Sequence, residues 1–328
     1  MKYDRRRVLL FAFVGALPIG SRGASAQDYP TRPIRLVIPY PPGGVVEAVG
    51  RPWAEKVRTL LGTIVVENIP GGGGEVGAAA VSRALPDGYT VLLGNTSNMV
   101  ISPLTSSHVP YDPVGSFDAV SILGQVTQAF TVHPSLPVRT MTELADYAKR
   151  NPGKLSYGTP GVGSLNQLTG ELLKIVIKAP DIVHVPYRGA GPAIVDLMGG
   201  QIPMAVTAVN GHLLELHRAG KLRILAVTSP QPLRGAPDLP TVAETGMPDL
   251  VAQSLTWLLV PKGTATAVIK RISQATAKAL AEPELQQIYQ AAGVEPSADA
   301  SPETATQRLK SEIAKWQPIV KQIGLKLD

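Results

Sequence analysis

Short apolar runs of strand type alternate with helical patterns along most of the chain, and this alternation limits the possible folds more than any other feature. Residues 34–40 (IRLVIPY) are apolar on both faces, as in a buried strand. Apolar residues from Val46 to Leu61 follow at helical spacing, and Pro52 is expected to kink that helix. Strands are then predicted at 63–70 and 89–95, with a helix at 77–85 between them. Because such connections join parallel strands by right-handed crossovers, the sequence predicts an α/β fold.

The alternation begins again after residue 129 and predicts a second α/β unit. Strands are expected at 130–134, 155–159, 182–187, 202–208 and 222–229, with helices at 140–150, 164–177 and 191–200. Thr140 and Ser301 are the expected caps of two helices. A strand at 254–264 and two helical segments return the chain to the first unit. We therefore expect one domain of residues 27–130 plus 253–328 and a second of residues 131–252.

The first 26 residues have the pattern of a secretory signal peptide. Basic residues precede a largely apolar, uncharged run at 8–20, which is too short to span a bilayer, and Ala24-Ser25-Ala26 is a small-x-small cleavage site. The pair Arg5-Arg6 leaves both twin-arginine and Sec export open. The mature chain is therefore expected in the periplasm.

Charge and cysteine content exclude several kinds of partner and site. Without residues 1–26 the chain keeps 26 Lys and Arg against 24 Asp and Glu, so the net charge falls from +6 to +2. The basic character thus belongs to the export signal and gives no support to nucleic-acid binding. The chain has no cysteine, which excludes disulfides, thiol catalysis and thiolate metal sites.

Three glycine-bearing joints occur where a predicted strand leads into a helix, at 41–44, 71–74 and 158–164. Glycine lets backbone N–H groups approach a ligand, and the helix N-terminus behind each joint adds unpaired donors with positive partial charge. In open α/β sheets ligands bind beyond the carboxyl ends of the strands. The joints therefore predict a backbone cradle for an anion; the alternative is glycine used only for tight connections.

Other chemistries find less support in the sequence. Gly72, Gly74 and Gly77 match the spacing of the dinucleotide fingerprint, but they follow the second strand, and no acidic residue ends the third. No nucleophile elbow or Walker A loop is present. His212 and His217 are five residues apart and do not share a helix face as i,i+4 ligands do. We therefore expect no catalytic residue, cofactor or metal.

At these residues the sequence resembles a known family. The segments YPTRPIRLVIPYPPGG, VVENIPGGGGEVGAAAVSRALPDGYTVLLGN, LPVRTMTELADYAKRNPGKLSYGTPGVGS and IVHVPYRGAGPAIVDLMGGQI are similar to the substrate-binding receptors of tripartite tricarboxylate transporters, the Bug receptors. The resemblance covers the whole mature chain. It implies a two-domain periplasmic binding protein of type II, a Venus flytrap with two crossing hinge strands, which closes over a small carboxylate and serves a membrane permease.

The resemblance, with the glycine joints, also implies the ligand contacts. The residues expected at the ligand are Tyr40, Gly43, Gly44, Val45, Val46, Gly72, Gly73, Asn95, Thr96, Ser97, Gly158, Thr159, Gly163, Ser164 and Tyr187. The chain departs from the family pattern at Val45, Val46 and Glu47, at Gln167 and at Pro203. A structural role at the start of its helix is expected for Glu47.

The leading hypothesis is a monomeric receptor for a small organic carboxylate with an apolar or aromatic body. Amides, hydroxyls, Tyr187 and valines suit such an acid better than an amino acid or citrate, because a buried ammonium needs a carboxylate or several carbonyls. Two alternatives are a binding protein whose partner is a sensor kinase and an exported α/β enzyme with an unrecognised catalytic group. The identity of the ligand, the permease and the sensor stay open.

Overall fold

The computed structural model describes residues 29–327, so the predicted signal peptide lies outside the described residues. The first lobe is built on strands in the order β2-β1-β3-β9-β4, in which β2, β1 and β3 are parallel and β9 runs antiparallel to both β3 and β4. Their bounds are β1 Ile34–Ile38, β2 Ile64–Asn68, β3 Thr90–Asn95, β4 Phe117–Val132 and β9 Gln253–Pro261. The predicted parallel crossovers of this unit are confirmed.

The second lobe continues the same sheet beyond β4. The last residues of β4 pair with β7 on one side and with β8 on the other, and β5 joins β7 to β6 in parallel. The strands are β5 Ser156–Thr159, β6 Val183–Pro186, β7 Met204–Ala208 and β8 Arg223–Val227. The predicted second α/β unit is therefore present.

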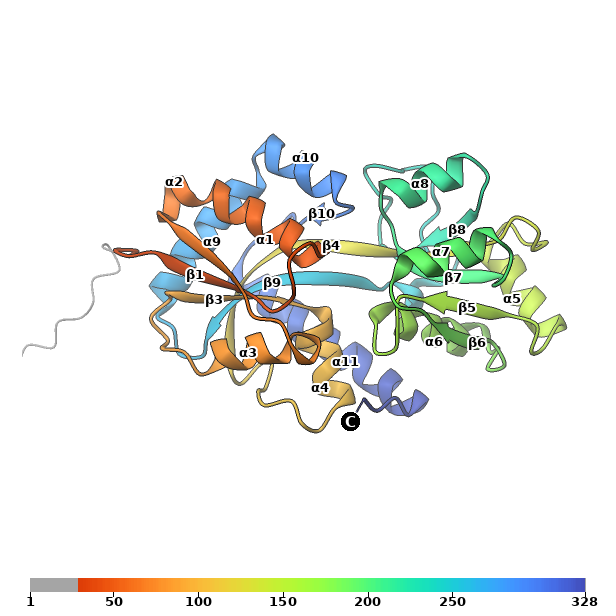
Figure 1. The fold of residues 1–328 in the computed structure, drawn as a ribbon, viewed down its shortest axis with the longest axis horizontal. Helices are drawn as coiled ribbons and strands as arrows, with labels where there is room; N and C mark the ends of the chain where they lie inside the picture. Colours follow the sequence, from red (N-terminus) through yellow and green to blue (C-terminus); the bar gives the residue numbers. More distant parts are fainter. Residues whose placement is uncertain (1–28, 328) are drawn as a thin grey trace, which may run out of the picture.

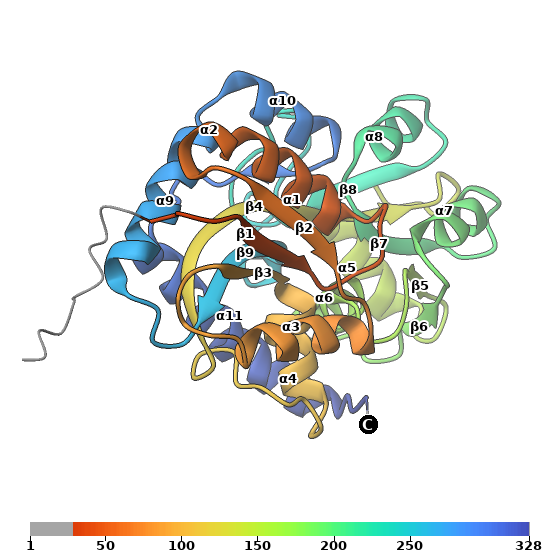
Figure 2. The same cartoon turned by 60° about the vertical axis from the view of Figure 1, so that its left-hand side comes forward.

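Helices cover both faces of each lobe (Figures 1 and 2). In the first lobe they are α1 Val45–Lys56, α2 Arg58–Leu61, α3 Glu75–Ser82, α4 Ser102–Thr105, α9 Thr266–Leu280, α10 Pro283–Ala291 and α11 Pro302–Ile323. In the second they are α5 Met141–Arg150, α6 Leu165–Ile177, α7 Ala190–Met198 and α8 Gly211–Arg218. Thr140 accepts from the Glu143 amide and Ser301 from the Thr304 amide, so both predicted caps are confirmed.

Two strands connect the lobes (Figure 1). Over residues 117–127 β4 pairs with β9, and over residues 128–132 it pairs with β7, so one continuous strand belongs to both lobes. The other connection enters β9 through Ala252, whose carbonyl accepts from the Thr228 hydroxyl of the second lobe at 2.5 Å. The fold is thus the expected two-lobed one with crossing strands.

Three sequence-based expectations are corrected. The strand expected at 130–134 is only the end of the 16-residue β4, and α8 was not expected. Three helices rather than two follow β9 among the described residues. Pro52 lies within α1, as the apolar spacing predicted, and the helix continues to Lys56 with Val49 and Trp53 fully buried.

Candidate ligand-binding site

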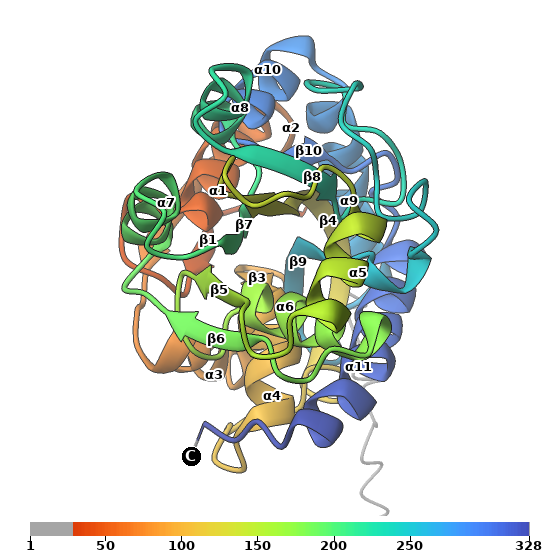
Figure 3. The same ribbon diagram turned by 90° about the vertical axis from the view of Figure 1, so that its right-hand side faces the viewer.

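The glycine joints lie at the carboxyl ends of strands on the sides of the two lobes that face each other. The loops after β1, β2 and β3 lie at the end of the first lobe that faces the second, and the loop after β5 lies at the end of the second lobe that faces the first (Figures 1 and 3). This is the edge at which ligands bind in open α/β sheets. The structure thus brings the predicted loops to one region between the lobes.

The first loop ends in three unpaired amides. Gly44 is the N-terminal cap of α1 in an extended conformation (φ −87°), and a Cβ built there meets nothing within 4 Å. The amides of Val45, Val46 and Glu47 donate to no described residue. They are the unsatisfied donors that a helix N-terminus offers to an anion.

The side chains of this loop divide between core and surface. Val46 belongs to the hydrophobic core and presents only its backbone, whereas Val45 is 47% exposed. Glu47 is buried, and its carboxylate accepts from the Gly43 amide and from Arg51 Nε, both at 2.5 Å. The Gly43 bond first, and then Arg51, lowers the pKa of Glu47. Glu47 therefore fixes the loop and takes the Gly43 amide for itself.

The loop after β2, residues 71–74, is held to the loop after β1 by Tyr40. Its hydroxyl shares a proton between the Gly73 carbonyl oxygen at 3.0 Å and Asn95 Oδ1 at 2.8 Å. Burial raises the pKa of Tyr40, so the phenol stays protonated. Gly72 and Gly73 have positive φ values of 53° and 64°, which favour glycine, and their amides donate to no described residue. Tyr40 thus connects the loops that follow β1, β2 and β3.

Asn95 ends β3, and Thr96 then caps a π-helical turn, η3 (Ser97–Ile101), a conformation frequent at functional sites. Asn95 Nδ2 and the Ser97 hydroxyl have no partner among the described residues, and both side chains are half-buried. Thr96 is fully buried, and its hydroxyl accepts from the Leu255 amide of β9 at 2.9 Å. The side chain of Thr96 therefore holds β9, and Asn95 and Ser97 are available to a ligand.

The second-lobe loop repeats the geometry of the first. Gly163 has φ +75°, and its amide donates to Gln167 Oε1 at 2.8 Å. Ser164 caps α6 by accepting from the Gln167 amide at 3.2 Å and donates to the Gly161 carbonyl at 2.7 Å. The amides of Leu165 and Asn166 donate to no described residue. A second set of unpaired donors thus faces the first lobe.

Gly158, Thr159 and Tyr187 support this loop from within. Thr159 is fully buried, with its hydroxyl 2.7 Å from His184 Nε2. A Cβ at Gly158 would lie 3.0 Å from the ring of Tyr187. The Tyr187 hydroxyl donates to Asp196 Oδ2 at 2.7 Å, and burial together with this bond raises the pKa of Tyr187 to about 12. Only the ring of Tyr187 remains as a contact surface.

Two features of the region were not found from the sequence. Val162, at the tip of the second-lobe loop, is 59% exposed and adds apolar surface. Asn166 Nδ2 donates to Gln128 Oε1 of β4 at 2.5 Å, which ties α6 to the crossing strand. A short polar residue at the second position of a helix could have suggested the Asn166 contact, but nothing in the sequence indicates its partner.

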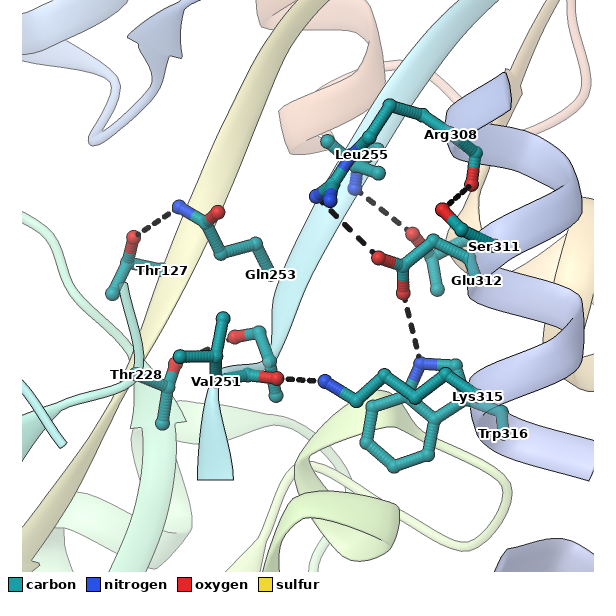
Figure 4. A network of polar contacts seen from close by, with 12 residues as sticks. Thr127, Thr228, Val251, Gln253, Leu255, Arg308, Ser311, Glu312, Lys315 and Trp316 are labelled. Carbon is teal, nitrogen blue, oxygen red and sulfur yellow. Dashed lines mark hydrogen bonds and ion pairs between the residues drawn. The ribbon is translucent and has the colours of Figure 1, made fainter. Parts of the chain in front are cut away.

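The crossing strands are held by a polar network with α11 (Figure 4). Gln253 Nε2 donates to Thr127 across the two strands at 3.1 Å, and Lys315 Nζ donates to the Val251 carbonyl just before β9. Trp316 Nε1 donates to Glu312, which is buried and also pairs with Arg308. Helix α11 is therefore anchored at the point where the chain re-enters the first lobe.

Other parts of the described chain add neither a metal site nor a membrane span. Among residues 29–327 no group of three or more His, Asp or Glu side chains could hold a metal ion. None of the helices in that range combines the length and apolar composition needed to cross a bilayer. A pocket of about 190 Å³ lies between α8 and the end of α10, but none of the predicted ligand residues lines it.

Comparison with known proteins matches this architecture. The family model described as "Tripartite tricarboxylate transporter family receptor" covers residues 49–325. BugT of Bordetella pertussis is 32% identical over 329 residues and 100% of both chains. An R. palustris protein solved with adipate is 30% identical, with TM-score 0.74 over 91% of this chain and 99% of that one. MatC of Rhodopseudomonas palustris, with bound malate, is 25% identical, with TM-score 0.71 over 89% and 100%.

These matches confirm the resemblance and the binding-protein fold that the sequence predicted. They extend over nearly all of the described residues and include both lobes. The chain therefore belongs to the receptor family of the tripartite tricarboxylate transporters, a family of periplasmic solute-binding proteins.

Proposed function

We propose that this chain is a periplasmic receptor that binds a small organic carboxylate between its lobes and delivers it to a membrane permease. The observation that carries the proposal is the pair of opposed helix N-termini, α1 and α6, whose first amides have no acceptor among the described residues. Such amides stabilise a carboxylate by hydrogen bonding and by the helix dipole together. Related proteins solved with adipate and with malate support this class of ligand.

The lobes are proposed to close on the ligand as two domains, residues 27–130 plus 253–328 and residues 131–252. A hinge at β4 and at the entry to β9 would need few residues to change conformation, because both connections are single strands. A ligand held by the first loop and by the second-lobe loop would favour the closed state, because its contacts with the second-lobe loop form only when the lobes are close.

The ligand is proposed to carry an apolar body. Val45 and Val162 are exposed beside the two sets of amides, and the ring of Tyr187 lies behind the second-lobe loop. Glu47, the acidic residue of the first loop, is already paired with Arg51, so it is a poor partner for a ligand ammonium. This arrangement favours an acid such as adipate over a free amino acid.

Calorimetric titration of the purified mature protein tests the proposal. The panel is adipate, malate, benzoate, citrate and glutamate. Solution scattering is recorded for the protein alone and with each acid. We expect binding of adipate or benzoate, together with a decrease in the radius of gyration. Tightest binding of glutamate, or heat without compaction for every acid, would contradict the proposal.

A further inference from the structure

The segment that follows α11 touches both lobes. Gly324 adopts a left-handed conformation (φ 66°) that ends α11 and reverses the chain, and the segment then runs beside α4 (Figures 1 and 3). The Leu327 amide donates to the Thr105 carbonyl at the end of α4, at 2.9 Å. The segment is thus attached to the first lobe a few residues beyond η3.

On its other side, Leu327 contacts the candidate binding loop of the second lobe. A Cβ built on Gly163 would lie 2.6 Å from Leu327 Cδ1, so the leucine side chain occupies the space that Gly163 leaves open. Gly163 is the residue whose amide is held by Gln167, directly before the cap of α6. Leu327 therefore rests on the backbone of the loop that presents the α6 amides.

Helix α11 gives this segment a firm base. Trp316 and Val320 are buried in the hydrophobic cluster that also includes Leu165 and Leu168 of α6. Lys315 is bonded to Val251 at the hinge. The position of Leu327 is therefore fixed relative to the hinge and to α4, whereas Leu327 itself is 41% exposed and adds little to the core.

We propose that Leu327 is a positioning residue of the binding site: by linking Thr105 to Gly163, it holds the second-lobe loop in the place where its amides meet a ligand from the first lobe. The functional part of this inference rests on the proposed function. The positioning itself is a property of the unliganded protein and can be measured without a ligand.

The test is amide hydrogen exchange of the unliganded protein as wild type, Leu327→Ala and Leu85→Ala. Leu85 is 74% exposed and lies before β3, at the far end of that strand, so it is a control for losing a surface leucine. Leu327→Ala is expected to speed exchange of the Gly163 and Gln167 amides, whose hydrogen bonds hold this loop, at least threefold with an unchanged melting temperature, and Leu85→Ala to leave it unchanged. Equal exchange in wild type and Leu327→Ala would overturn the proposal.

A second pair of variants tests the contact itself. Gly163→Ala should also speed exchange, because its Cβ displaces Leu327 and its positive φ is unfavourable for alanine. In the Leu327→Ala background the same change should add less, since the displaced side chain is gone. Fully additive effects would show that the two residues act independently and would contradict the proposal.

Adipate titration of the same variants separates this inference from the proposed function. We expect Leu327→Ala to weaken adipate binding three- to tenfold and Leu85→Ala to change it less than twofold. If wild type fails to bind any acid of the panel, the proposed function fails while the exchange result still decides the positioning role. If Leu327→Ala speeds exchange but leaves adipate affinity unchanged, the role in binding is overturned.

Discussion

The two binding loops have the same backbone design but opposite electrostatics. In each, a glycine with positive φ donates its amide to the side chain four residues later: Gly43 to Glu47, and Gly163 to Gln167. The first loop thus places a carboxylate beside the N-terminus of α1, and the second-lobe loop places a neutral side-chain amide beside the N-terminus of α6. Since a negative charge at the N-terminus opposes a bound anion, the α6 loop keeps more of its positive potential for a ligand.

The next helical turn explains why the residues differ. Four residues after Glu47 stands Arg51, which pairs with it, whereas four residues after Gln167 stands Glu171, which pairs with Lys174 and accepts from Tyr157. A glutamate at 167 would face a like charge one turn away, which destabilises a helix. The comparison teaches that the first loop offers a ligand open space at Gly44, whereas the second-lobe loop offers an anion a more positive potential.

The largest expected effect is the loss of the open shape at Gly44. Gly44→Val should weaken carboxylate binding at least tenfold, on the order of 1.4 kcal/mol, because the side chain covers the α1 amides. The fold should persist, since φ is ordinary and the site of the Cβ is empty. Calorimetry measures the affinity, and Gly211→Val, at the equally open start of α8, is the matched control. An unchanged affinity would remove the first loop from the site.

Adding a negative charge to the second-lobe loop should have the next largest effect. Gln167→Glu is expected to weaken carboxylate binding about fivefold, or about 1 kcal/mol, by placing a second negative charge near the ligand. Titration at two salt concentrations checks the cause, because added salt should reduce an electrostatic loss. A loss that does not depend on salt would point to altered loop geometry instead of charge.

Removing the Ser164 cap of α6, in the second-lobe loop, should reduce both stability and binding. Ser164→Ala should lower the free energy of unfolding by about 1 kcal/mol and weaken binding about threefold, since the cap orders the loop. Thr140 caps α5 in the same way at a distance from the loops, so Thr140→Ala should cost similar stability and no affinity. Urea unfolding and calorimetry on both variants distinguish the two roles. Equal affinity losses in both would contradict a local role of Ser164.

The smallest effect is expected from neutralising the first loop. Glu47→Gln should strengthen carboxylate binding about twofold, because it removes a negative charge from the α1 N-terminus. The folded-state pKa of Glu47 is lowered, so its stabilisation is present above the ordinary value of 4.5 and is lost as pH falls through the lowered pKa. Melting temperatures should therefore fall less in the variant than in wild type as the solution is acidified from pH 5. Weaker binding by Glu47→Gln would instead make Glu47 a ligand contact.

Much of this fold was predictable from the hydrophobic periodicity of the sequence, and the wrong predictions have physical causes. The caps at Thr140 and Ser301 were predictable because capping is local. Most of β4 was missed, because Ser121 and Gly124 interrupt its apolar pattern and the strand is defined by its distant partner β9. The helix through Pro52, by contrast, was predictable, because Val46, Val49 and Trp53 recur at helical spacing.

The candidate site shows the same limit. The loops were predictable from glycine at strand ends, and the structural role of Glu47 from its place in the first turn. The burial of Thr96 and Thr159 was not, since each hydroxyl is bonded to a residue far along the chain. The contact between Leu327 and Gly163 joins segments that only the folded chain brings together.

A crystal structure of the protein with a bound carboxylate from the titration panel tests the central claim most directly. We expect carboxylate oxygens at about 3 Å from amide nitrogens of both loops, among them Val45 or Val46 and Leu165 or Asn166. The lobes should lie closer together than in the unliganded protein. A carboxylate bound only in the pocket between α8 and α10, with the α1 and α6 amides facing water, would contradict the account.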